Sequence, residues 1–519
     1  MSKMKKLLAM LLALAMVLGM SITTMAVDGK PEAENTAIAT IQNVEEGADI
    51  KVYQIVDAFY DDYGFVKYVR DNGLTEDDLS DIYNPTYDEI MEISKKTLDE
   101  YTHLEDGTQA EIVWAYAKGE YTAALEAGMY LVIVVGEGAT VYNPMIVSIG
   151  YDTTKSGSMN ALVPGSVSAE DDWELNDAIV AAKSSDISID KTIVGGDTRY
   201  EVGDTVNYKV ETIIPSYSGQ YTDVTFKITD TIVNGLAYVT DNNGVIVDPV
   251  VTVGGGDPVL KGETTYTVNT ATSGKMIIDF ADEYILGLAG MSDEARKVVI
   301  TYSAKITSSA ITQAAENNVV LDYTNAPDDE KDTDDTEYAY TFNIDNVLTK
   351  TGVGDDANAL DGAKFTLYAA LKDGESAYTT NDDGEQVLKD GYAVIEIDTV
   401  KTAVRVVDTM TTGEDGDIEF KGLDADLTYY VKETEAPAEY SINETVYTIT
   451  FEVTKENKTE YTYNVLVNGE KETVTVPNTK LVSLPSTGGI GTTMFTIGGC
   501  GIMIAAAYLF FASRKREEA

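Results

Sequence analysis

Two stretches of alternating residues decide the fold: TVNYKV at residues 205–210 and YTITFEV at residues 447–453. Apolar or aromatic side chains occupy every second position in both stretches. A period of two places these side chains on one face of a strand, where they pack on a core while the other face meets solvent. Similar stretches recur between turns rich in Gly, Asp and Asn, a pattern typical of antiparallel β-sandwiches. We therefore predict a mainly β protein.

One region departs from this pattern. Between residues 75 and 125, the segments 87–98 and 110–116 have the apolar spacing of helices. We expect a helical insertion in the first domain there.

Both ends of the chain carry export and sorting features. Residues 1–26 combine lysines with a short apolar run and small residues, which is the layout of a secretory signal peptide, and we predict cleavage after Ala26. The run is shorter than the roughly 20 residues of a spanning helix, which argues against an N-terminal anchor. At the other end, LPSTG at residues 484–488 precedes an apolar stretch long enough to span a membrane, and then a basic tail.

Composition excludes several classes of function. The chain has 87 acidic and 37 basic side chains and a net charge of −50, so its field repels phosphate backbones and excludes nucleic acid as a partner. The single cysteine, Cys500, lies in the C-terminal apolar stretch, which leaves the mature chain without disulfides or thiol nucleophiles. We expect no cofactor and no metal, since acidic loops such as NDDGE at residues 381–385 lack full calcium-loop spacing.

The length of the chain suits about three domains. Residues 184–186 and the acidic run 328–337, which is too charged to pack, are predicted linkers. We therefore expect a signal peptide at 1–26, domains at 27–183, 184–332 and 338–480 strung end to end in a rod, and a sorting signal, membrane span and basic tail at 484–519. Similarity of residues 187–192 to 342–350 suggests that the second and third domains are related sandwiches.

Two lysines stand out on the first strands of the second and third domains. Lys191 and Lys350 each belong to a strand that is otherwise apolar on one face. Burying an ammonium ion is so costly that the pKa of the amine falls and the group enters the core neutral, as a nucleophile. A lysine that flanks a strand with its head in solvent is the alternative.

The C-terminal signal and the third domain resemble sortase-assembled major pilins of Gram-positive bacteria. YYVKETEAPAEY at residues 429–440 resembles the pilin E-box YxLxETxAPxGY, departing at Val431 and Glu439. LDGAKFTLY at residues 360–368 and GDIEFKGL at residues 416–423 resemble strands of a Cna B-type sandwich. The resemblance therefore implies tandem immunoglobulin-like or Cna-type sandwiches, with a C-terminal transmembrane helix in the precursor.

The resemblance also implies a sortase reaction at the sorting motif. A sortase would cut between its last two residues and transfer the threonine carbonyl to an amine. WELNDAIVAAK at residues 173–183 is similar to the pilin motif WxxxVxVYPK, although it is one residue longer and lacks Tyr-Pro, and it implies Lys183 as the accepting amine. The motif consists of Leu484, Pro485, Ser486, Thr487 and Gly488.

Internal cross-links are the other implication. In the third domain, the family pattern carries over as a bond from Lys350 to Asn478, assisted by Glu433. Burial would keep the assisting carboxyl protonated and the amine neutral, and attack would expel ammonia. This is a single-turnover reaction within the chain, so the protein is not expected to be an enzyme.

The middle domain offers a second set of three residues. By resemblance, Lys191 is the nucleophile and Asp230 the assisting acid. Asn317 fits the family pattern NxAxLxY, and Asn325, which lies on the same face of the predicted strand, is the alternative.

The sequence thus predicts a secreted shaft subunit of a covalently polymerised pilus (fimbria), which supports adhesion and sits on the cell wall after a transient membrane stage. The expected partners are other copies of the chain, a pilus-assembling sortase, minor pilins and peptidoglycan, with host surface ligands as further candidates. A monomeric cell-wall-anchored adhesin is the alternative. A surface enzyme is a third possibility, for which the mature chain offers only His103 and no cysteine.

Overall fold

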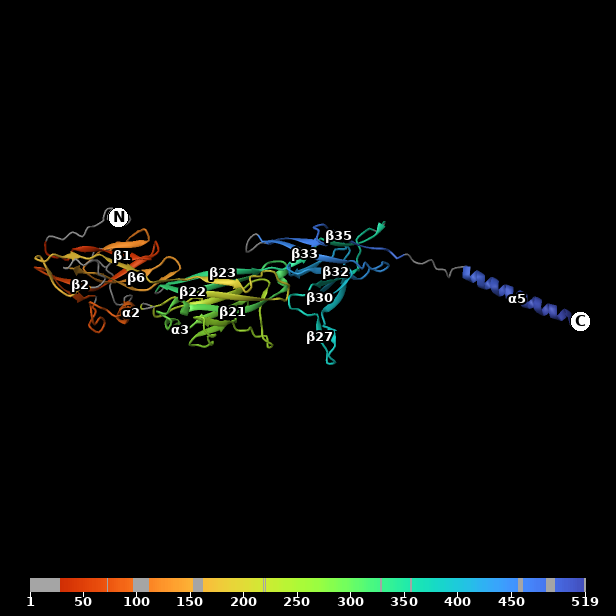
Figure 1. Cartoon of the computed structure of the whole chain (residues 1–519), viewed down its shortest axis with the longest axis horizontal. Helices are drawn as coiled ribbons and strands as arrows, with labels where there is room; N and C mark the ends of the chain where they lie inside the picture. The colour runs from red at the N-terminus through yellow and green to blue at the C-terminus, as the bar shows by residue number, and fades with distance from the viewer. Residues whose placement is uncertain are drawn as a thin grey trace. The chain divides into compact units, whose positions relative to one another are not determined.

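The computed structural model describes residues 29–71, 73–96, 112–152, 162–217, 219, 221–326, 329–354, 357–455, 461–481 and 491–517 (Figure 1). The chain divides into two compact units near Phe342. Strands make up most of the described elements, which confirms the prediction of a mainly β fold.

The N-terminal part of the first unit consists of two facing sheets. A four-stranded sheet runs in the order β12 (Ala178–Ala181), β1 (Thr36–Gln42), β5 (Glu120–Glu126) and β4 (Ala115–Ala117). A five-stranded sheet runs in the order β10 (Val167–Ser168), β3 (Gly64–Arg70), β2 (Asp49–Asp61), β6 (Gly128–Val135) and β8 (Met145–Ile149). Side chains of both sheets, Ile41 and Val132 among them, form one core cluster.

The five-stranded sheet is buried on its second face as well. There Leu131 and Trp173 share a cluster with Ile90 and Ile93 of helix α2 (Tyr87–Lys96). Because both faces are covered, β6 is a continuous apolar run, GMYLVIVV, rather than an alternating one. Short ladders join β9 (Tyr151–Asp152) to β11 (Glu174–Leu175) and β7 (Thr140–Tyr142) to β13 (Ser184–Asp186).

The helical insertion is only partly confirmed. Helix α2 covers the first of the two expected segments, but the second is wrong, because residues 112–114 have no regular structure and β4 follows them. Strand β5 also overlaps the region expected to be helical. Its apolar side chains alternate with a period of two, and pairing with β1 in the sheet outweighs the helix propensity of its Ala, Leu and Glu residues.

The C-terminal part of the first unit is a sandwich whose core contains side chains of both sheets, such as Tyr208 and Leu321. One sheet contains β14 (Ile189–Ile193), β15 (Thr205–Ile213), β21 (Lys297–Ile306) and β17 (Leu236–Tyr238), with β18 (Val250–Val253) also paired to β21. The other contains β19 (Tyr266–Asn269), β20 (Lys275–Phe280), β16 (Phe226–Ile232), β22 (Ala315–Ala326) and β23 (Asp329–Ala339). The helical turns are α3 (Asp282–Leu286), α4 (Asp293–Arg296) and η1 (Ser308–Ile311).

Both predicted linkers are wrong, since each forms a strand. The acidic run is β23, which pairs along its length with β22. Charged side chains are tolerated there because β23 is the outer strand of its sheet, so its backbone is hydrogen-bonded to β22 while polar side chains reach water. Residues 184–186 are β13, which pairs with β7. The proposed domain boundaries stay predictions, although the middle sheet continues past residue 332 to Ala339.

The second unit is built on a six-stranded sheet. Its order is β29 (Tyr392–Ile397), β30 (Val400–Thr411), β26 (Lys364–Ala369), β32 (Tyr429–Glu435), β33 (Val446–Lys455) and β34 (Tyr461–Val467). Three further ladders join β24 (Phe342–Ile344) to β31 (Phe420–Leu423), β25 (Leu348–Gly352) to β35 (Val474–Asn478), and β27 (Tyr378–Thr380) to β28 (Gln386–Leu388). The last described element is helix α5 (Gly491–Glu517).

A glycine lies against strand β25 of this unit and gives a test of the packing. Gly416 has a φ of +73°, and a Cβ there would lie 2.5 Å from the carbonyl oxygen of Lys350. We expect Gly416→Ala to destabilise the second unit by about 1–3 kcal/mol more than Gly384→Ala. Gly384 has a similar φ of +82° with nothing within 4 Å, so it controls for backbone strain alone. Urea unfolding of both variants measures the difference, and equal midpoints would contradict the close approach.

Candidate functional site

Strand β14 carries Lys191 into the core of the middle sandwich. The strand alternates, so Ile189, Lys191 and Ile193 share its buried face. Lys191 is 1% exposed, and burial lowers the pKa of its amine while the nearby carboxylate of Asp230 opposes that shift. Burial therefore makes this amine easier to deprotonate than an exposed lysine, and the neutral amine is the nucleophile.

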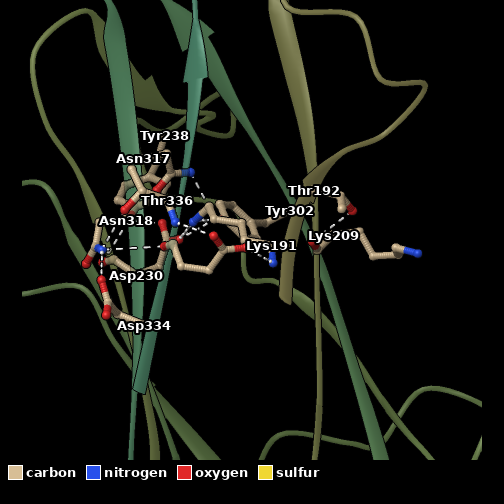
Figure 2. A network of polar contacts seen from close by, with 11 residues as sticks. Lys191, Thr192, Lys209, Asp230, Tyr238, Tyr302, Asn317, Asn318, Asp334 and Thr336 are labelled. Atoms are coloured by element: carbon tan, nitrogen blue, oxygen red, sulfur yellow. Dashed lines mark hydrogen bonds and ion pairs between the residues drawn. The ribbon is translucent and has the colours of Figure 1, made fainter. Parts of the chain in front are cut away.

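Four strands from both sheets supply the groups around this amine (Figure 2). Lys191 Nζ donates to Asp230 Oδ2 and to the hydroxyl of Tyr302, at 2.7 Å for the latter. The Tyr302 hydroxyl donates to Asp230 Oδ2 and accepts from Asn317 Nδ2 at 3.0 Å. Tyr238 donates to Asp230 Oδ1 at 2.7 Å. The predicted lysine, acid and asparagine thus meet in one buried network.

Asn325 lies elsewhere, although it is on the same strand. Eight residues separate it from Asn317, which corresponds to roughly 26 Å along a strand. Its Nδ2 donates to the carbonyl oxygen of Gly136 at 3.2 Å. Of the two asparagines that the sequence left open, the structure therefore brings Asn317 to Lys191 and leaves Asn325 away from it.

The second unit holds a related arrangement. Strands β25 and β35 are parallel, with Lys350 opposite Val476 and Gly352 opposite Asn478, so the lysine and the asparagine project from adjacent strands toward β32. Asn478 Nδ2 donates to Glu433 Oε1 at 2.7 Å, and Lys350 Nζ lies 3.9 Å from Glu433 Oε2. All three side chains are at most 2% exposed.

Burial changes the chemistry of this second lysine. Desolvation lowers the pKa of Lys350 to about 8, and the charge of Glu433 opposes that shift. The amine also donates to the carbonyl oxygen of Val476 at 2.7 Å. About a tenth of such an amine is neutral at pH 7, far more than for an exposed lysine.

The side-chain carbonyl oxygens of the two asparagines are unpaired within the described part of the chain. Asn317 Oδ1 and Asn478 Oδ1 are buried without a hydrogen-bond partner among the described residues, as is Asn325 Oδ1 outside the two sites. An unpaired buried carbonyl costs roughly 1–3 kcal/mol. In each site an amine, a carboxyl group and a primary amide are thus confined together, with the amide carbonyl unsolvated, and this set of groups can perform amide exchange with loss of ammonia.

Lys183 has the opposite environment. It is exposed and lies between β12 and β13, where its carbonyl oxygen accepts from the backbone of Asn143 at 3.0 Å. Trp173, the first residue of the pilin-like motif, is 1% exposed and donates its indole N–H to the carbonyl oxygen of Gly29 at 2.9 Å. The motif therefore combines a buried anchor with a solvent-exposed amine.

Several predicted features lie outside the described residues. These are the signal peptide, His103 and the sorting motif with Thr487. Directly after the motif, helix α5 contains a stretch, Met494–Arg514, that is long and apolar enough to cross a membrane.

Comparison with known proteins covers most of this architecture. Residues 34–184 match the T6 antigen Ig-like domain family, residues 345–466 match the SpaA prealbumin-like fold domain family, and residues 476–518 match the LPXTG cell wall anchor motif. The trypsin-resistant surface T6 protein of Streptococcus pyogenes is 24% identical over 576 residues, spanning 97% of this chain and 99% of that protein. The chain resembles a sortase-assembled backbone pilin.

A solved structure agrees at the level of the fold. The T6 backbone pilin of Streptococcus pyogenes has a TM-score of 0.58 to this pilin-like chain at 17% identity, covering 87% of this chain and 100% of that one. The wall-anchor match, together with the apolar helix α5, makes this pilin-like chain a cell-wall-anchored surface protein with a transient membrane anchor.

Sequence reasoning missed the tyrosines of the pilin-like middle sandwich. Tyr302 shares the buried face of β21 with Ile300 and Ala304, so the alternation of that strand would have placed it in the core. A buried tyrosine hydroxyl usually needs a hydrogen-bond partner, which could have directed attention to Asp230.

The lowered pKa of Lys350 predicts a pH dependence of stability in an Asn478→Ala variant, which lacks the amide for any cross-link. Between about pH 8 and the ordinary lysine value of 10.5, the unfolded chain binds more protons than the folded one. The stability of the second unit should therefore rise with pH across this window. Urea midpoints should show the rise, and the matched double variant Lys350→Met/Asn478→Ala should lack it. Parallel pH profiles in both variants would contradict the shift.

Proposed function

We propose that this chain is the structural shaft subunit of a covalently polymerised surface pilus. The observation that carries the proposal is the combination of two buried lysine, acid and asparagine sets with an exposed motif lysine and a wall-anchor signal. The T6 relatives, a surface protein and a backbone pilin, support the same assignment.

The first element of the proposal is two internal isopeptide bonds. Lys191 would bond to Asn317 with Asp230 assisting, and the bond in the second unit would join Lys350 to Asn478. The support is geometric: both sets are buried, and each carboxyl group lies at its lysine. Each bond would form once, within the chain and with release of one ammonia, so the protein acts as a structural component rather than an enzyme.

These bonds suit a fibre under tension. Lys350 and Asn478 lie on adjacent strands near opposite ends of the second unit's sequence, so their bond closes nearly the whole unit as a loop. In the chain-entropy model, closing a loop of this length stabilises the folded state by about 4–5 kcal/mol. Force applied through the two ends would pass through the covalent bond instead of separating the strands.

The second element is polymerisation. A sortase would cleave after Thr487 and join its carbonyl to the Nζ of Lys183 on another copy, and the last subunit would pass to peptidoglycan. The exposure of Lys183 supports its access to an enzyme. Other copies of the chain, a pilus-assembling sortase and minor pilins are therefore the expected partners, and adhesion is the expected role of the fibre.

Intact mass tests the internal bonds. The mature chain should be lighter than its sequence by two ammonia molecules. Asp230→Ala and Glu433→Ala should each restore one, because each removes one assisting acid. Asn325→Ala is the matched control and should keep the full deficit. A wild-type mass equal to the sequence mass would remove both cross-links from the proposal.

Polymerisation is tested separately in cells that assemble the protein. Lys183→Arg should abolish the high-molecular-weight ladder on denaturing gels, because arginine keeps the charge but cannot accept the acyl group. Lys67→Arg, on the exposed face of β3 in the same domain, should leave the ladder intact. An unchanged ladder in Lys183→Arg would exclude this lysine, and the absence of any ladder in the wild type would favour the lone wall-anchored adhesin.

A further inference from the structure

We propose that Tyr302 is a catalytic group of the middle-domain cross-link and carries a proton from Asp230 to the departing nitrogen of Asn317. The inference rests on the proposed isopeptide function and assigns a step within it. The two sites differ in whether the acid hydrogen-bonds to the asparagine directly or through another residue.

In the second unit the acid meets the amide directly. Glu433 Oε1 accepts from Asn478 Nδ2 at 2.7 Å. In the middle sandwich, no hydrogen bond joins Asp230 to Asn317 within the described part of the chain. The amide nitrogen instead donates to the hydroxyl of Tyr302 at 3.0 Å, and that hydroxyl donates to Asp230 Oδ2. The tyrosine therefore occupies the position between acid and amide.

The hydroxyl of Tyr302 touches every group of the reaction. A hydroxyl has one donor and two acceptor positions. Here the donor is directed to Asp230, and the acceptors receive Lys191 Nζ at 2.7 Å and Asn317 Nδ2. The hydrogen-bonding capacity of the Tyr302 hydroxyl is therefore fully used by Asp230, Lys191 and Asn317.

The environment keeps this hydroxyl protonated. Burial raises the pKa of Tyr302 well above its ordinary value, and the charge of Asp230 adds to the shift. Tyr238 holds the carboxyl group from its other side, donating to Asp230 Oδ1 at 2.7 Å and to the Asp230 carbonyl oxygen at 3.1 Å. Tyr238 is a positioning residue, since it contacts the acid but none of the reacting atoms.

The proton balance closes with these groups alone. Lys191 first gives one proton to Asp230, which leaves a neutral amine and a neutral acid. The amine attacks Cγ of Asn317, forming the Nζ–Cγ bond, and the amide nitrogen becomes basic as it turns tetrahedral. Tyr302 then donates to this nitrogen and takes a proton from Asp230. The Cγ–Nδ2 bond breaks, ammonia leaves, and Asp230 accepts the remaining proton from Nζ.

The test follows both bonds in one chain during cell-free synthesis, with samples quenched over time and cross-linked peptides quantified by mass spectrometry. Tyr302→Phe should slow the bond between Lys191 and Asn317 by about 100-fold or more, the usual contribution of a positioned proton donor. The bond between Lys350 and Asn478 should form at the wild-type rate, because its acid reaches the amide directly.

Tyr266→Phe is the matched control. Tyr266 lies in the same core, and its hydroxyl donates to the carbonyl oxygen of Val259 at 3.2 Å instead of to a group of the reaction. It should leave both bonds unchanged. A wild-type rate in Tyr302→Phe would overturn the proposal. Asp230→Ala separates the two hypotheses, because formation of the middle-domain bond without Asp230 would instead refute the assignment of the assisting acid.

A second measurement tests the proposal even if the Tyr302→Phe variant does not fold correctly. Site-specific 3-fluorotyrosine at position 302 keeps the hydroxyl and the packing but makes the phenol more acidic. The rate of the bond between Lys191 and Asn317 should change, with no change at Lys350. An unaltered rate at both sites would reject proton transfer through Tyr302.

Discussion

An amine confined in a dry β-sandwich is the constraint on which the rest of the molecule depends. Water would hold a lysine protonated, whereas burial of Lys191 and Lys350 lowers the pKa of each amine. Such burial is unfavourable unless nearby groups compensate for it, and each lysine has a carboxyl group beside it. Because amine, acid and amide come from different strands, the reactive set exists only after the strands have paired. Folding would therefore control when the proposed bonds form.

The two sites satisfy this constraint with different strand geometry. In the second unit, lysine and asparagine lie on adjacent parallel strands, and Glu433 on a third strand reaches the amide directly. In the middle sandwich, lysine and asparagine come from opposite sheets, β14 and β22, and the carboxyl group of Asp230 is shorter by one methylene. There the hydroxyl of Tyr302 lies between the carboxyl group of Asp230 and the amide of Asn317 and hydrogen-bonds to both. In the proposed reactions, the bond would thus be assisted by a long acid alone in the second unit and by a short acid with a phenol in the middle sandwich.

Period-two alternation predicted β15 and β33, and resemblance placed lysines, acids and asparagines on strands that the structure brings together. Alternation could not choose between Asn317 and Asn325, since both lie on one face. The family pattern favoured Asn317, and the register of β22 against β16 places Asn317 near Asp230. The acidic run of β23 was mistaken for a linker because charge density says nothing about position at a sheet edge. Tyr302 was missed because its role arises from contacts across the sandwich.

Lys183 and Lys191 are eight residues apart, and their different environments suit them to different bonds. Lys183 is exposed, so the bond proposed for it would need an acyl group activated by another protein. Lys191 is buried beside an acid and a primary amide, so its bond would need no enzyme. An exposed amine suits a contact between subunits, which must wait for assembly. A buried amine suits a bond that must be complete before the subunit bears load.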